Sequence, residues 1–121
     1  MANYDVKKES HVFGLMIMDC YSYLIKMTKE FSIARQLLRS GTSVGANIRE
    51  AQDGESKKDF LHKMNISLKE AKETQYRLWL LRDAWWIAEY TKAKDLMKKA
   101  SELSRMLTKI VRTTKQNLWI K

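Results

Sequence analysis

The sequence predicts an all-α protein, an antiparallel up-down-up-down four-helix bundle. The 121 residues contain no proline and only four glycines, and so few turn formers favour helices joined by short connections. Apolar residues recur at steps of three and four along four segments, which is the spacing of one helical face. No segment alternates like a strand, and the length suits one domain over residues 1–121.

The first two helices are expected at about residues 10–30 and 32–51. Gly41 and Gly45 lie on the apolar side of the second, where each costs about 1 kcal/mol in helix propensity. We expect this cost to be offset by close approach to a neighbouring helix. The apolar face of the first helix carries Phe13, Met16, Cys20, Tyr23 or Leu24, and Met27; that of the second carries Ala34, Leu37, Gly41, Val44 and Ile48.

The third and fourth helices are expected at about residues 56–88 and 91–114. Ser56 followed by Asp59 resembles a capping box, and Thr91 is the expected N-cap of the last helix. The stripe of the third runs through Phe60, Met64, Ser67, Ala71, Thr74, Leu78, Leu81 and Trp85. The stripe of the fourth runs through Ala93, Leu96, Ala100, Leu103, Leu107 and Ile110.

The stretch "RSGTSVGANIREA" at residues 39–51 is rich in small and hydroxyl residues. A phosphate-binding loop would follow a strand and end in Gly-Lys-Ser/Thr, whereas this stretch keeps helical periodicity and lacks that ending. Arg39, Ser43, Asn47 and Glu50 share its other face. That face is interpreted first as a solvated surface or a hydrogen-bond network between subunits, and second as a ligand site.

Two sequence blocks resemble a known family. The first contains Arg39-Ser40, Ser43-Val44, Asn47-Ile48 and Glu50-Ala51, and the second contains "SKKDF" at residues 56–60, then Ser67, Glu70-Ala71 and Glu73-Thr74. Their spacing is similar to that of the four-helix-bundle proteins encoded in intervening sequences of bacterial 23S ribosomal RNA genes. The accessory variability determinant (Avd) proteins of diversity-generating retroelements share that fold. The resemblance covers about Val12 to Leu107, and Ala51 stands where many members have Gly, which indicates one subgroup.

The resemblance implies a ring-like homo-oligomer, with a homopentamer expected. For the Avd branch it also implies binding of nucleic acid and of a reverse transcriptase. For the intervening-sequence branch it implies no particular activity.

The positive charge is concentrated near the end of the chain. The net charge is +9, and residues 91–121 contain nine Lys or Arg against two acids. Five of these cations fall within about 60° of one helical face, opposite the apolar stripe: Lys94, Lys98, Arg105, Lys109 and Arg112. Such a face favours a polyanionic partner, RNA or DNA, contacted through its backbone. The alternative is a basic surface that serves only solubility.

The third helix also carries a second apolar face. We expect it to form the oligomer interface, since Trp and Tyr often anchor interfaces. One alternative is that other segments of the same chain cover both faces, and another is base stacking on exposed Trp. This second face consists of Leu61, Leu68, Trp79, Trp86 and Tyr90, with Tyr76 beside it.

Little in the sequence points to catalysis, and no enzyme, metal or cofactor is expected. Di-metal bundles need Glu-x-x-His on two helices, and only Asp59 with His62 is comparable. Glu70 and Glu73 are more simply interpreted as ion-pair partners of nearby Lys69, Lys72 or Arg77 than as ligands of Mg²⁺.

The single cysteine, Cys20, cannot form an intrachain disulfide and is expected to be buried. The most apolar run, residues 13–25, is too short to span a bilayer. A cytoplasmic protein without a membrane partner is therefore expected.

The predicted function is that of a non-enzymatic, oligomeric nucleic-acid-binding accessory protein. The alternative is a homo-oligomeric protein-interaction scaffold with an acidic protein partner.

Overall fold

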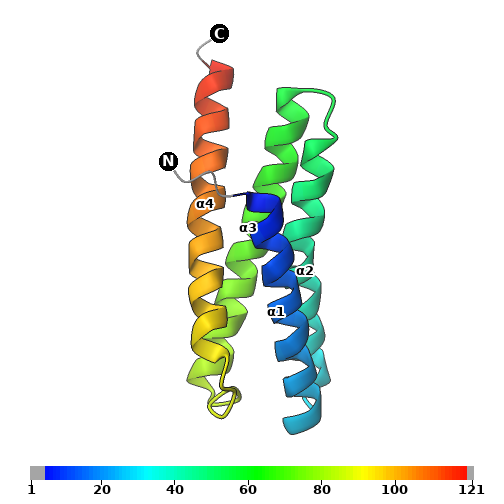
Figure 1. Cartoon of the computed structure of the whole chain (residues 1–121), viewed down its shortest axis with the longest axis vertical. Coiled ribbons are helices and arrows are strands. Elements are labelled where there is room, and N and C mark those ends of the chain that lie inside the picture. The colour runs from blue at the N-terminus through cyan, green and yellow to red at the C-terminus, as the bar shows by residue number, and fades with distance from the viewer. Residues whose placement is uncertain (1–4, 120–121) are drawn as a thin grey trace.

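The structure, a computed structural model, describes residues 5–119, with the side chain of Trp119 excluded. It contains helices α1 (Val6–Met27), α2 (Phe31–Gln52), α3 (Lys57–Asp83) and α4 (Ala93–Trp119), and no strand within the described residues. The helices run alternately down and up (Figure 1). Each packs on its neighbours in chain order, and α4 packs back on α1. The predicted antiparallel four-helix bundle is confirmed.

The apolar stripes predicted from the sequence meet in one core. Phe13 and Ile17 of α1, Leu37 of α2 and Leu78 of α3 are fully buried, as is Leu107 of α4. Met27, which the spacing placed on the inner face of the first helix, is instead 65% exposed at the end of α1.

Two helix starts have side-chain caps. The carboxylate of Asp5 accepts hydrogen bonds from the backbone N–H groups of Lys7 and Lys8, so α1 begins four residues before the predicted start at residue 10. The hydroxyl of Ser56 accepts a hydrogen bond from the N–H of Asp59 at 3.1 Å, as the capping pattern predicted. These caps satisfy N–H groups that have no partner within the helix.

The prediction that Trp85 belongs to the core was wrong. Helix α3 ends at Asp83, and Trp85 adopts a left-handed backbone conformation (φ 68°) with 79% of its surface exposed. The N–H of Trp86 donates to the carbonyl of Leu81 at 3.0 Å, and that of Trp85 to the carbonyl of Arg82 at 3.1 Å. This Schellman-type ending turns the chain outward at Trp85. Helix α4 then starts at Ala93, so Thr91 is not its N-cap as predicted, and the helix continues beyond the predicted residue 114.

Helices α1 and α2 approach closely at the two glycines. A Cβ atom added at Gly41 would lie 2.7 Å from Cγ1 of Ile17, and one at Gly45 would lie 3.3 Å from Oγ of Ser10. The expected close helix–helix approach is confirmed. Because Ile17 is β-branched and fully buried, it has little freedom to move away.

Within residues 5–119, no helix combines the length and the apolarity that a membrane crossing requires.

Replacing Gly41 and Gly14 with alanine should have opposite effects. Gly41→Ala gains about 1 kcal/mol in helix propensity but crowds Ile17, and overpacking costs roughly 1–3 kcal/mol. We expect its free energy of unfolding to fall by about 1 kcal/mol. A Cβ at Gly14 would meet no described atom within 4 Å, so Gly14→Ala should be stabilising. Urea denaturation monitored by circular dichroism measures both, and a more stable Gly41→Ala variant would contradict the close approach.

Candidate nucleic-acid interface

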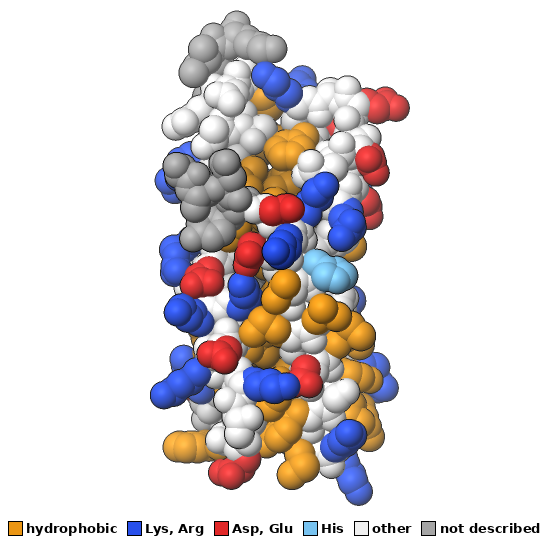
Figure 2. Space-filling model, viewed as in Figure 1, with side chains coloured by type: hydrophobic (Ala, Val, Ile, Leu, Met, Phe, Trp, Pro, Cys, Tyr) orange, Lys and Arg blue, Asp and Glu red, His pale blue; other side chains and the backbone are white. Residues whose placement is uncertain are grey.

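The five predicted cations lie on the outward side of α4, and we call them the basic stripe. All five side chains are exposed, and within the described residues none of them forms an ion pair. Figure 2 shows Lys and Arg side chains following one another along the α4 edge of the molecule. The basic stripe consists of Lys94, Lys98, Arg105, Lys109 and Arg112.

Two other cations, Lys99 in α4 and Lys92 just before it, have partners on α1. Lys99 contacts Glu9 at 2.6 Å, and Lys92 contacts Asp19 at 3.5 Å. These pairs connect α4 to α1, whereas the basic stripe faces solvent. The positive field of the stripe is therefore not neutralised by direct contacts within the described chain.

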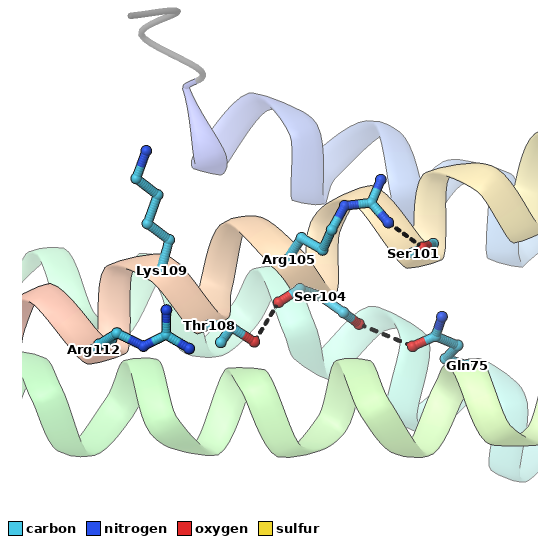
Figure 3. A pocket seen from close by; sticks show the side chains of 7 residues that line it. All are labelled: Gln75, Ser101, Ser104, Arg105, Thr108, Lys109 and Arg112. Carbon is cyan, nitrogen blue, oxygen red and sulfur yellow. Dashed lines mark hydrogen bonds between the residues drawn. The ribbon is translucent and has the colours of Figure 1, made fainter.

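A shallow groove of about 490 Å³ lies between α3 and α4 beside the stripe (Figure 3). The hydroxyl of Ser104 donates to Oε1 of Gln75 at 3.3 Å, which links the two helices. The guanidinium of Arg105 donates to the hydroxyl of Ser101 at 2.7 Å. Among the residues that the structure describes, no carboxylate lines the groove, so its chemistry suits an anion. Its lining residues are Gln75, Ser101, Ser104, Arg105, Thr108, Lys109 and Arg112.

Sequence reasoning missed the neutral half of this groove. Ser101, Ser104 and Thr108 recur at steps of three and four along α4, which is a signal that they share one side. The sequence alone does not show that this side of α4 lies against Gln75 of α3.

The four polar residues predicted to share a face of α2 do not converge on one site. The guanidinium of Arg39 contacts Glu70 at 3.1 Å and Glu73 at 3.5 Å on α3. Lys63 of α3 contacts Glu50 at 2.7 Å. The side chains of Ser43 and Asn47 donate to backbone carbonyls of α2 itself. This face is therefore a network of contacts within one chain, mainly between α2 and α3.

The two glutamates considered as metal ligands are partners of arginine. Glu73 also contacts Arg77 at 3.5 Å, one turn along α3. Within residues 5–119, no group of three or more His, Cys, Asp or Glu side chains is arranged to hold a metal ion.

The residues predicted to form the oligomer interface are mostly used within the chain. Leu68 and Tyr90 are only 8% exposed, and Leu61 and Trp86 pack against the core. This corrects the prediction for Leu68, because α3 lies between α2 and α4 and buries one face against each. It also corrects the prediction for Tyr90, because this residue lies beyond the end of α3 and its side chain contacts α1. Trp79 keeps 42% of its surface exposed.

Further large apolar side chains, which the sequence pattern did not predict to form an interface, are also exposed. Figure 2 shows apolar side chains gathered over the lower part of the face that α1 forms. Tyr76, which the helical spacing places beside the second apolar face, is 56% exposed. The others include Leu15 and Met18 on α1, and Leu80 and Trp85 at the end of α3.

Tyr90 connects the α3–α4 turn to α1. Its hydroxyl donates to the carboxylate of Asp19 at 2.5 Å, and its ring lies 4.9 Å from that of Tyr23. The hydrogen bond from Tyr90 lowers the pKa of Asp19, with Lys92 as a weaker contributor. Burial and the same hydrogen bond raise the pKa of Tyr90 above its ordinary value.

Cys20 is buried in the core, as predicted. Burial raises the pKa of its thiol to about 12, so it is protonated and unreactive at neutral pH.

Comparison with known proteins decides the family. The model of the family described as "23S rRNA-intervening sequence protein" matches residues 2–109. The chain belongs to this family. A crystal structure of a protein of unknown function, from the S23 ribosomal protein family of Bacteroides thetaiotaomicron, is 42% identical over 88% of this chain and 97% of that chain, with a TM-score of 0.83. No curated protein matches this chain. The resemblance to the intervening-sequence proteins is confirmed, and the relationship to Avd proteins stays a prediction.

Tyr90→Phe should destabilise the protein more at neutral pH than in acid. Because the pKa of Asp19 is lowered in the folded state, its contribution is present above the unfolded pKa near 4 and is lost as the pH falls through the folded pKa. We expect a loss of about 1 kcal/mol at pH 7, since Asp19 is half exposed. Urea midpoints at pH 7 and pH 2 test this. The same loss at both values would show that the Asp19 charge does not contribute.

Proposed function

We propose that this member of the 23S rRNA-intervening sequence family is a non-enzymatic accessory protein that binds RNA or DNA through the basic stripe. The observation that carries the proposal is the row of five exposed cations without ion pairs among the described residues. The row extends over about 27 Å of α4 and borders a groove in which no described lining residue is acidic.

The arrangement supports contacts to phosphates rather than to base edges. A duplex carries one phosphate charge per about 1.7 Å of its axis, so the stripe can neutralise several. The residues of the stripe are Lys and Arg on one straight helix, and no known base-reading motif accompanies them. Binding by charge and shape is therefore the mode that we propose.

The assembly that we propose is a ring-like homopentamer. The resemblance to Avd proteins supports it, and the exposed apolar side chains of α1 and α3 provide surface for subunit contacts. In such a ring the stripe is repeated in every subunit, which raises the local charge density. A reverse transcriptase is the protein partner that the Avd relationship would add.

Reversing three stripe charges should abolish binding. We expect the variant with Lys98, Arg105 and Lys109 changed to Glu to bind labelled RNA and DNA at least about 100-fold more weakly, because attraction to phosphates becomes repulsion. Fluorescence anisotropy measures the affinity. Circular dichroism should show an unchanged helical bundle, since all three side chains are exposed.

The matched control reverses three exposed cations on α1 and α2: Lys8, Arg35 and Arg49. Both triple variants lower the net charge equally, so only the location differs. Similar losses in both would mean that binding depends on overall charge, and full binding by the stripe variant would refute the proposed site.

The second candidate function is a scaffold for an acidic protein. The exposed Tyr76, Leu80 and Trp85 near the end of α3 favour it, because exposed aromatic residues are common in protein interfaces. A pull-down from native lysate before and after nuclease treatment separates the two functions. A protein partner that survives the nuclease favours the scaffold, and loss of all bound material favours nucleic-acid binding.

A further inference from the structure

Trp79 lies one helical turn beyond Gln75, which lines the groove between α3 and α4, and is not itself a lining residue. It is four residues after Gln75, so the two side chains share one side of α3. Gln75 lines the groove and accepts the hydrogen bond from Ser104 of α4. Because α3 and α4 run antiparallel, the next turn of α3 lies toward the first half of α4. That half carries Lys94 and Lys98 of the basic stripe.

Trp79 belongs to an exposed part of the last turns of α3. Leu68, three turns earlier on the same side, is only 8% exposed, whereas Trp79 is 42% exposed and Tyr76 beside it is 56% exposed. Small side chains on α4, Ser101 and Ser104, face this part of α3 and leave the groove open. A large aromatic side chain is thus presented beside a row of cations.

We propose that the α3–α4 face binds single-stranded nucleic acid, with a base stacked on Trp79 and the adjoining phosphates held by the groove and the basic stripe. The inference rests on the proposed function and adds that the bound nucleic acid is single-stranded. Proteins that bind single strands combine a positive groove for the backbone with aromatic side chains for the bases. In a duplex the bases are already stacked on one another, so Trp79 has no base to receive.

The positive charge of the α3–α4 face favours single-stranded nucleic acid over a second copy of the chain as its binding partner. Two copies meeting through this face about a two-fold axis would bring two basic stripes together, which is repulsive. The nearest acids on α3 are already paired, since Glu73 contacts Arg39 and Arg77 while Asp83 contacts Arg82. A polyanion with exposed bases matches both the charge and the aromatic surface.

The test compares Trp79→Leu with Trp79→Phe. Leucine keeps an apolar side chain against the bundle but lacks an aromatic face, and phenylalanine keeps that face. The probes are labelled 20-nucleotide uridine and thymidine single strands and mixed-sequence duplexes of RNA and DNA of equal length. We expect Trp79→Leu to weaken single-strand binding about 10-fold and duplex binding less than about twofold. Trp79→Phe should retain most of the single-strand affinity.

The matched control is Phe31→Leu. Phe31 is 44% exposed, close to the value for Trp79, but lies on α2, which does not pack on α4. Its replacement should leave all four affinities unchanged. Equal effects on the uridine and thymidine strands would show that the shared backbone and stacking are recognised, and an effect on one of them alone would identify the sugar or base preferred at Trp79.

Three results with Trp79→Leu would overturn the inference. The first is equal loss of single-strand and duplex affinity in Trp79→Leu, and the second is no loss of either. The third is a change of sedimentation mass in Trp79→Leu, which would place Trp79 in a subunit contact. A wild-type protein that prefers duplexes would also overturn it while leaving the proposed function intact. Absence of binding to all four probes by the wild-type protein would refute the proposed function itself.

Discussion

The packing of α4 against α3 determines most of the surface on which function is proposed. Leu103 and Leu107 of α4 are fully buried, and Leu68 of α3 is almost so. Once these side chains are buried, the opposite side of α4 must face water. Its cations remain there because a buried charge without a partner is costly. The basic stripe and the groove beside it are thus consequences of one helix–helix contact.

A second set of contacts explains why polar residues occur in the apolar stripes. The hydroxyls of Ser40 and Thr74 share a hydrogen bond of 2.8 Å between α2 and α3, and Ser67 donates to the carbonyl of Val44 at 2.8 Å. Buried hydroxyls with partners cost little and fix the register of two helices. Many residues that carry the resemblance to the intervening-sequence proteins lie in this α2–α3 contact, and this gives them a structural role.

Helical periodicity was sufficient to predict the bundle, its core stripes, the close approach at Gly41 and the exposure of the basic stripe. Each of these features follows from which residues share one face of a single helix. Periodicity failed at Trp85, since the projection assumed a continuing helix and a left-handed tryptophan has no local signal such as glycine. Helical periodicity also does not show what covers the second apolar face of α3. In the structure α4 packs on this face, where the sequence predicted another subunit. The groove was missed because it requires Gln75 and Ser104 from different helices.

The most direct test of the account is the salt dependence of nucleic-acid binding by the unmodified protein. If all five cations of the stripe contact phosphates, log Kd plotted against log salt concentration should have a slope per protomer of roughly 4 to 5 in magnitude for a duplex and roughly 3 to 4 for a single strand. That slope would match the number of cations in the stripe, as the account predicts. Absence of binding at low salt, or binding with almost no dependence on salt, would contradict the central claim that α4 recognises a polyanion.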